Sequence, residues 1–313
     1  MYDWGHSRRF NAYSNYFKKA FGSRIQKVSI DAGFTCPNRD GNISVGGCKY
    51  CNNNSFKPSY ATTANTIKEQ IQKGIEFHNN RYKSPSKFLA YFQAYSNTYK
   101  PLNELKIIYS AATEFSEIAG FVIGTRPDCI DDEKLKYFKE LSEKYYLIIE
   151  YGIESCNNSI LKNINRGHTF EQASEAIIKT AEYGIKTGAH LIMGLPGESR
   201  DELLQSVNKI SKLPLNNIKF HQLQIIRDTE FARNYKENPD NFNLFSSSEY
   251  IDFIINYIEL LNPKFVIERF SGESPPQLKI APDWNGIRSR DFLEILEKEM
   301  EKRNTWQGKL FIA

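Results

Sequence analysis

Three cysteines in one short stretch, DAGFTCPNRDGNISVGGCKYCN, form the pattern in this chain that is best suited to chemistry. Cys48 and Cys51 make a Cys-x-x-Cys pair, and eleven residues separate Cys36 from Cys48. Thiolates spaced in this way can converge on a zinc ion or an iron–sulfur cluster. A closed site of either kind takes four protein ligands, so a set of three leaves one coordination position open. The stretch therefore predicts a metal centre that binds a cofactor or a substrate.

A structural zinc site is the alternative interpretation of the same cysteines. Cys129, Cys156 or one of the five histidines can supply a fourth ligand from elsewhere in the chain. The residues before Cys36 bear on the choice, because IQKVSIDAG alternates in the manner of a strand. The cysteine loop then leaves the end of a strand, where barrels and open α/β sheets place their active sites. This position favours the reactive centre.

The rest of the chain alternates between strand and helix patterns, which predicts the elements that position the cysteine loop. Strands are expected at 25–33, 87–95, 119–125, 146–153, 187–194 and 218–226. Helices are expected at 65–77, 101–112, 132–144, 170–184 and 201–212. Beyond residue 240 the alternation weakens to a helix at 249–261, a strand at 264–270 and a last helix from Asp291. Six strand–helix units predict an α/β fold with a parallel sheet, and a closed barrel would need eight.

The composition narrows the class of protein. With 313 residues and 40% hydrophobic side chains, the chain is long enough for one large α/β domain. It has no run of about 18 apolar residues, and its first residues, MYDWGHSRRF, lack the apolar segment of a secretory signal. We therefore expect no membrane span and a cytoplasmic location, which an odd number of cysteines also favours. The net charge of +4 permits an anionic partner such as RNA.

Residues 1–24 are expected to form a helical segment in front of a core at 25–240, with a C-terminal extension at 241–313 packed on that core. Phe10, Tyr13, Phe17 and Phe21 recur at spacings of three and four, so one helix face can pack on the core. The basic residues of the same segment, RRFNAYSNYFKKAFGSR, can instead contact phosphates of a nucleic acid. Packing is the favoured interpretation.

A series of short stretches follows the cysteine loop along nearly the whole chain: YFQAYSNTY, GTRPDC, EYGIES, NINRGHT, HLIMGLPGE, FHQLQI, ERFSGESP and APDW. Together with GFTCPNRDGNISVGGCKYCNN, they resemble the radical S-adenosylmethionine (radical SAM) superfamily, and within it the YhcC/YtqA family. That family is related to the elongator catalytic subunit and to oxygen-independent coproporphyrinogen oxidases. The spacing from Cys36 to Cys48 departs from the commonest form in the superfamily and is close to that of the elongator-like branch.

The resemblance implies a partial (β/α)6 barrel of the TIM type with a C-terminal cap. It also implies that Cys36, Cys48 and Cys51 hold three irons of a [4Fe–4S] cluster, and that the fourth iron binds S-adenosylmethionine (SAM). An electron from a flavodoxin- or ferredoxin-type donor would cleave SAM to a 5′-deoxyadenosyl radical, which takes a hydrogen atom from the substrate. The cofactors would carry this step, and the protein would orient the reactants and exclude competing reactions.

Five further residues are candidates for SAM binding by the same resemblance: Tyr50, Gln93, Glu154, Arg166 and His190. Tyr50 can instead pack within the loop, and Glu154 with Arg166 can instead form a surface salt bridge. Gln93 ends the second strand where relatives have a glycine-rich segment. His190 is favoured slightly as a satisfied core histidine, because it stands alone in an apolar strand.

The catalytic candidates are Arg126, His221 and Cys129. Arg126 follows the third strand and His221 lies in the sixth. Both are expected to point to the barrel mouth, where they can bind an anionic group of the substrate. Asp128 can hold either of them in place, or it can cap the helix that begins with DEKL. Cys129 can donate a hydrogen atom or a proton late in the reaction. The alternative, which is commoner for buried cysteines, is an inert thiol that only packs in the core.

The resemblance implies a tRNA-modifying enzyme. The reaction assigned to the YtqA branch converts 5-carboxymethylaminomethyl-uridine at the wobble position to 5-aminomethyl-uridine. Two alternatives remain: a radical SAM enzyme that acts on a different, porphyrin-like small molecule, and a non-catalytic iron–sulfur or zinc protein that binds RNA. Iron content and release of 5′-deoxyadenosine after reduction distinguish an enzyme from a binding protein.

Overall fold

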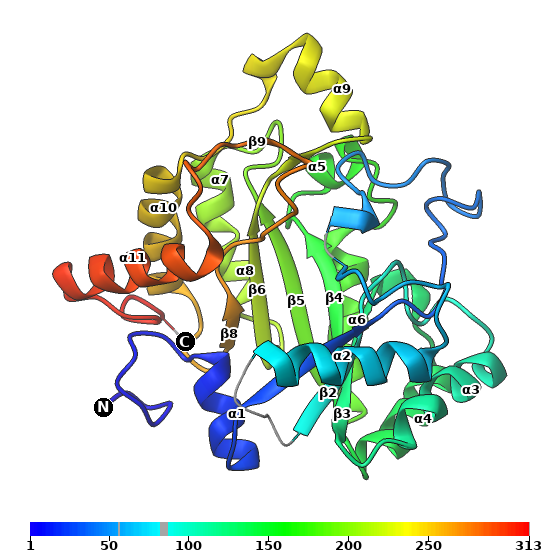
Figure 1. Cartoon of the computed structure of the whole chain (residues 1–313). Coiled ribbons are helices and arrows are strands. Elements are labelled where there is room, and N and C mark those ends of the chain that lie inside the picture. The colour runs from blue at the N-terminus through cyan, green and yellow to red at the C-terminus, as the bar shows by residue number, and fades with distance from the viewer. Residues whose placement is uncertain (56, 82–86, 313) are drawn as a thin grey trace.

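A curved parallel sheet of seven strands forms the centre of the protein (Figure 1), in a computed structural model that describes residues 1–55, 57–81 and 87–312. The strands lie in the order β1-β2-β3-β4-β5-β6-β8, and every neighbouring pair is parallel. Their bounds are Ile25–Ile30, Lys87–Phe92, Ile118–Thr125, Tyr146–Glu154, Lys186–Met193, Asn217–Gln222 and Val266–Arg269. The predicted α/β fold with a partial barrel is confirmed.

Helices connect successive strands and cover the outer face of the sheet (Figure 1). They are α2 (Ile67–Arg81), α3 (Leu102–Thr113), α4 (Asp132–Ser142), α5 (Asn158–Asn163), α6 (Phe170–Glu182), α7 (Arg200–Gln205) and α8 (Val207–Ile210). The helix expected at 201–212 is therefore two short helices that meet at Ser206. The sequence patterns gave no signal for α5 or for α9 (Glu230–Glu237), because both are too short to show a helical period.

The C-terminal part of the chain adds a strand to the main sheet. The strand expected at 264–270 is β8, and it pairs with β6 in parallel, after α10 (Ser247–Leu260). The sixth expected strand, at 218–226, is wrong in length: β6 ends at Gln222, and β7 (Ile225–Ile226) pairs with β9 (Lys279–Ala281) in a separate ribbon. The last helix, α11 (Ser289–Lys302), lies beside α10 (Figure 1).

The two faces of the sheet carry different cores, because neighbouring side chains in a strand point to opposite faces. Residues such as Phe88 and Phe92 pack against the outer helices in the larger apolar cluster. Leu89, Val122 and Ile148 belong to a smaller cluster that also contains Phe17 of α1 (Tyr13–Phe21). The N-terminal helix thus packs against the inner side of the sheet.

The N-terminal segment contacts both edge strands. Helix α1 touches β1 and β8, and Ala12 forms a parallel bridge with Ile267 of β8. Phe10 and Phe17 are buried, which confirms the packing interpretation for this aromatic face. Within residues 1–55, 57–81 and 87–312, the structure contains no helix that could cross a membrane.

Candidate functional site

One cavity of about 650 Å³ lies inside the curve of the sheet, and it unites the predicted site residues from distant parts of the sequence. Its volume falls in the range of small-molecule sites in proteins. The described residues that line it come from the cysteine loop, the inner face of the strands, α1 and the loop after β8. Of the predicted residues, these line it: Cys36, Cys48, Tyr50, Cys51, Gln93, Arg126, Glu154, Arg166, His190 and His221.

The cysteine loop folds tightly over one end of this cavity. The amide of Cys51 donates to the carbonyl of Cys48 at 2.9 Å, which closes the Cys-x-x-Cys turn. Gly47 has a φ of +86°, and a β-carbon there would lie 2.7 Å from the Arg39 side chain. Arg39 in turn donates to the carbonyl of Cys51 at 2.7 Å. The loop therefore needs a glycine at Gly47 both for its backbone angle and for its contact with Arg39.

Positive and polar donors surround the thiol groups. Arg166 places a guanidinium nitrogen 3.6 Å from the sulfur of Cys48, and the Asn38 amide lies 3.5 Å from the same sulfur. Burial, followed by the charge of Cys48, raises the pKa of Cys51 to about 11. A thiol must lose its proton to bind a metal, so metal binding at this site releases protons.

The donor set fits an iron–sulfur cluster. Three thiols face one space, and hydrogen-bond donors beside ligand sulfurs are a known means of tuning such clusters. Among the described residues, no three His, Cys, Asp or Glu side chains gather as they would around a single metal ion. Three thiols at one cavity suit an iron–sulfur cluster, whose ligands are spread over several irons.

Glu154 and Arg166 form an ion pair of 3.4 Å in the cavity wall. Their side chains are only 12% and 8% exposed, so the alternative of a surface salt bridge is wrong. The Arg166 guanidinium also donates to the carbonyl of Gly152 at 2.7 Å, which fixes its direction. Tyr50 and Gln93 line the same cavity, and Gln93 contacts the hydroxyl of Ser29 at 3.4 Å. Their contact with SAM stays a prediction.

Arg126 is held by Asp128 rather than left open to a ligand. Two guanidinium nitrogens of Arg126 donate to the Asp128 carboxylate at 2.8 and 2.7 Å, and a third donates to the carbonyl of Arg166 at 2.7 Å. The helix-cap alternative for Asp128 is wrong, because Asp131 caps α4 by accepting from the amide of Lys134. Asp128 therefore positions Arg126, as the first of its two predicted roles.

Cys129 stands next to this pair but is not among the described residues that line the cavity. Burial, followed by the charge of Asp128, raises the pKa of its thiol to about 12. The thiol is therefore protonated at neutral pH, as a hydrogen-atom donor must be. Its role in the reaction stays a prediction.

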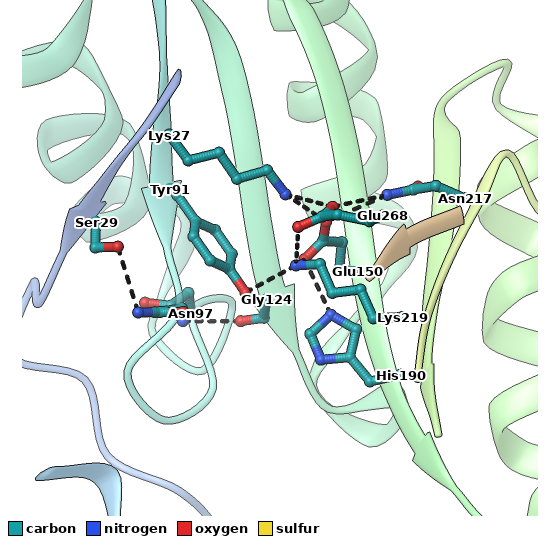
Figure 2. Close-up of polar contacts among 11 residues, drawn as sticks. Lys27, Ser29, Tyr91, Asn97, Gly124, Glu150, His190, Asn217, Lys219 and Glu268 are labelled. Atoms are coloured by element: carbon teal, nitrogen blue, oxygen red, sulfur yellow. Dashed lines mark hydrogen bonds and ion pairs between the residues drawn. The ribbon is translucent and has the colours of Figure 1, made fainter. Parts of the chain in front are cut away.

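Buried charged side chains from four strands meet in the barrel interior (Figure 2). Glu150 of β4 contacts Lys27 of β1 at 3.0 Å and Lys219 of β6 at 2.5 Å. Glu268 of β8 contacts the same two lysines, at 2.6 and 3.1 Å. We name these residues the lumen cluster: Lys27, Glu150, Lys219 and Glu268. The cluster neutralises itself in pairs, as buried charges must.

Sequence reasoning missed the lumen cluster, although a signal was present. Glu150 interrupts the apolar run YLIIEYGI, and a lone charge there needs a partner across the sheet. His190 joins the cluster by a 3.0 Å contact with Glu150, and burial lowers its pKa. This contact satisfies His190, as the core interpretation expects, yet the ring also lines the cavity.

His168 is buried beside Arg166, and its lowered pKa makes the folding stability depend on pH. Its Nε2 lies 3.2 Å from the carbonyl of Gly152, and burial, followed by the charge of Arg166, lowers its pKa to about 2. Below about pH 6.5 the unfolded chain binds a proton here that the folded chain does not. Folding stability should therefore fall with decreasing pH, by about 1.4 kcal/mol per pH unit from this residue.

We expect His168→Gln to remove that part of the pH dependence. Urea unfolding of both proteins between about pH 7 and pH 5 measures it as a difference in slope. Parallel lines for the two proteins would show that His168 is protonated equally in the folded and unfolded states.

Comparison with known proteins agrees with this geometry. The Radical SAM superfamily profile matches residues 36–210, and the Radical SAM C-terminal domain profile matches residues 215–302. The chain is 31% identical to YtqA of Bacillus subtilis over 306 residues, which cover 97% of this chain and 93% of YtqA. It is 31% identical to YhcC of Escherichia coli over 289 residues, covering 91% and 90% of the two chains.

Two further relatives are more distant. A tRNA uridine(34) acetyltransferase of Methanocaldococcus infernus is 26% identical over 185 residues, which cover 58% of this chain and 33% of that protein. Among solved structures, Elp3 of Methanocaldococcus infernus superposes with a TM-score of 0.66 at 18% identity, covering 90% of this chain and 64% of Elp3. The second likeness shows a common fold. With its cysteine loop, its partial barrel and these matches, the chain belongs to the radical SAM superfamily, in the group of YtqA and YhcC.

Proposed function

We propose that this radical SAM enzyme modifies the wobble uridine of tRNA, converting 5-carboxymethylaminomethyl-uridine to 5-aminomethyl-uridine. A distant relative that shares part of the chain is named for its action on uridine 34 of tRNA, which supports a substrate of this kind. A cluster with SAM, when bound, supplies a 5′-deoxyadenosyl radical able to take hydrogen from the carbon between the amine and the carboxylate. A flavodoxin- or ferredoxin-type protein in the cytoplasm would provide the electron.

One observation carries the proposal: the cysteine loop and the lumen cluster line the same cavity. A base bound in the polar barrel interior would therefore lie in the same cavity as the cofactors that the cysteine loop would hold. The cavity is enclosed by the sheet, so a base must leave its stack to enter it. Proteins recognise single-stranded anticodon bases in this way, by flipping them into a pocket.

The proposed roles follow the positions of the side chains. Cys36, Cys48 and Cys51 would hold the cluster, and the cavity-lining candidates would orient the bound cofactor: Tyr50, Gln93, Glu154, Arg166 and His190. Arg126 is fixed by Asp128, so it would shape the cavity wall more than move toward a ligand. His221 would face the substrate. Loss of one hydrogen atom and then of one electron, which the oxidised cluster would accept, would turn the carbon–nitrogen bond into an imine, and water would split it into the 5-aminomethyl group and glyoxylate. The protonated Cys129 thiol would serve as a proton donor in this sequence.

Nucleoside analysis tests the proposed reaction. tRNA from a strain that lacks the gene should accumulate 5-carboxymethylaminomethyl-uridine, and the reconstituted, reduced protein with SAM should convert it to 5-aminomethyl-uridine. Mass spectrometry of digested tRNA measures both nucleosides, and chromatography measures the 5′-deoxyadenosine released. Unchanged wobble uridines in the deletion strain would contradict this substrate and favour a different small molecule.

A further inference from the structure

The ERFSGESP stretch contributes to the cavity through an irregularity in β8. Ile218 of β6 pairs with Ile267 of β8, but the next residue, Lys219, pairs with Arg269, so Glu268 is an extra residue in the strand. Side chains in a regular strand alternate between faces, whereas this bulge lets both Glu268 and Arg269 line the cavity. Bulges are common beside active sites, where they redirect a side chain.

The two neighbours have different surroundings. Glu268 is fully engaged with the two lysines of the lumen cluster (Figure 2). Arg269 is half-buried in the cavity wall, and its guanidinium makes no hydrogen bond or ion pair within the part of the chain that the structure describes. By contrast, Arg126 and Arg166, which also line the cavity, each contact a carboxylate. Among the described residues, Arg269 is therefore a cavity-lining cation that no carboxylate contacts.

His221 provides a second unsatisfied group beside Arg269. It lies two residues beyond Lys219 on the same face of β6, and its Nε2 is buried without a hydrogen-bond partner in the described residues. Burial, followed by the charge of Arg269, lowers the pKa of His221 well below its usual value. The ring is therefore neutral and can donate or accept one hydrogen bond to a ligand.

Hydrogen bonds connect the loop after β8 to the residues that follow His221, and they hold Arg269 and His221 in position. Gln222 and Gly272 exchange hydrogen bonds of 2.8 and 3.1 Å, and Gln224 accepts from the hydroxyl of Ser274 at 2.7 Å. A β-carbon on Gly272 would lie 2.9 Å from Nδ1 of His221, so the loop approaches the ring closely. The FHQLQ and ERFSGES stretches are thus joined by hydrogen bonds into one wall of the cavity.

We infer that Arg269 and His221 form a subsite that binds an anionic group of the substrate, a carboxylate on the base or a phosphate of the RNA backbone. The guanidinium would supply the charge and paired donors, and the imidazole would supply one further hydrogen bond. The inference deepens the proposed function, and rests on it for the nature of the substrate. It moves the anion-binding role predicted for Arg126 to Arg269, because the Arg126 fork is occupied by Asp128.

Equilibrium binding to the reconstituted holoenzyme, without reductant so that no turnover occurs, tests the subsite. The probes are 5-carboxymethylaminomethyl-uridine and its methyl ester, each with and without a 5′-phosphate. Wild-type protein should prefer one anionic form by roughly tenfold or more, as expected for a charge-assisted hydrogen bond in a cavity. Arg269→Gln should lose that preference, and Arg269→Lys should keep part of it.

The pattern of loss identifies the anion. Loss of the preference for acid over ester assigns the subsite to the base carboxylate, and loss of the preference for the phosphate assigns it to the backbone. Arg290→Gln is the matched control, because Arg290 is 87% exposed on α11 and should leave every affinity unchanged. His221→Asn should weaken the same anion several-fold, with an unfolding midpoint that shows it is folded.

Three results would overturn the subsite: no anion preference in the wild-type protein, the full preference retained in Arg269→Gln, or weaker SAM binding in that variant with the preference intact. Conversion of the wobble uridine is measured in a separate assay with tRNA as the substrate. Conversion of the wobble uridine with a wild-type KM in Arg269→Gln would leave the proposed function standing without the subsite. An Arg269-dependent preference in a protein that converts no tRNA would leave the subsite standing without that function.

Discussion

The Cys48→Ala protein is expected to retain little iron after anoxic reconstitution and to release almost no 5′-deoxyadenosine when reduced with SAM. Only two thiols would remain at the cavity end, and the Arg166 and Asn38 donors beside Cys48 would lose the sulfur they face. We expect SAM cleavage to fall by more than about 100-fold, because the loss of a ligand exceeds the effect of disturbing its partners. Iron analysis and chromatography of 5′-deoxyadenosine measure the two effects.

Cys156→Ala is the matched control for this change. Cys156 is also a buried thiol, but it packs in the outer core and is not among the described residues that line the cavity. Its replacement should leave iron content and SAM cleavage near wild-type values. If Cys48→Ala kept its iron and its turnover, the cysteine loop would not be the cluster site, and the interpretation of the cavity would be wrong.

The second large effect is expected from Glu150→Gln, which removes the central carboxylate of the lumen cluster. Glu150 is fully buried and contacts Lys27, Lys219 and His190. Lys219, itself 1% exposed, would lose one of its two carboxylate partners in the barrel interior. Breaking a buried ion pair in this way costs about 3–5 kcal/mol of folding free energy. Urea unfolding monitored by circular dichroism measures the loss.

The pH dependence of Glu150→Gln gives an independent check. Burial alone would raise the pKa of Glu150, but Lys219, Lys27 and His190 hold it well below its usual value. The ionised carboxylate therefore stabilises the fold above the unfolded-state pKa of about 4.3, and this stability is lost as the pH falls below that value. The difference in folding free energy between the wild-type protein and Glu150→Gln should therefore shrink as the pH falls through that acidic range.

An exposed ion pair provides the control. Asp132 and Lys179 contact each other at 2.7 Å, with side chains 57% and 43% exposed. Asp132→Asn should lower the folding free energy far less than Glu150→Gln, because exposed ion pairs contribute little to stability. Equal losses for Asp132→Asn and Glu150→Gln would mean that the lumen cluster is no more important to folding than a surface contact.

Much of the fold could be predicted because its signals are local. Apolar periodicity places α2, α4 and α6 close to their observed positions, and the buried parallel strands read as apolar runs. The cysteine loop was found from spacing alone, and the family resemblance identified the side chains that gather around it. Most of these residues line one cavity, as a barrel mouth requires.

The remainder depends on tertiary pairing that no local pattern encodes. The separation of β6 from β7 arises because Ile225 and Ile226 find a partner in β9, more than fifty residues later. The bulge at Glu268 follows from the register against β6, and it decides that Arg269 faces the cavity. Likewise, the sequence could suggest that Arg126 pairs with Asp128. It could not show whether this pairing leaves guanidinium donors available to bind a ligand.

The position of α1 has a consequence for how the open sheet is closed. The edge strands β1 and β8 are the two ends of the sheet, and they are joined by α1 and by the ion pair between Lys27 and Glu268. Tyr13, Ser14 and Phe17 of this helix line the cavity. The seam of the barrel is therefore closed by side chains together with one backbone contact, in which the amide of Ile267 donates to the carbonyl of Asn11 at 2.8 Å. Because Phe17 also belongs to the apolar cluster on the inner face, shortening the first helix would uncover apolar side chains of β2, β3 and β4, such as Leu89, Val122 and Ile148.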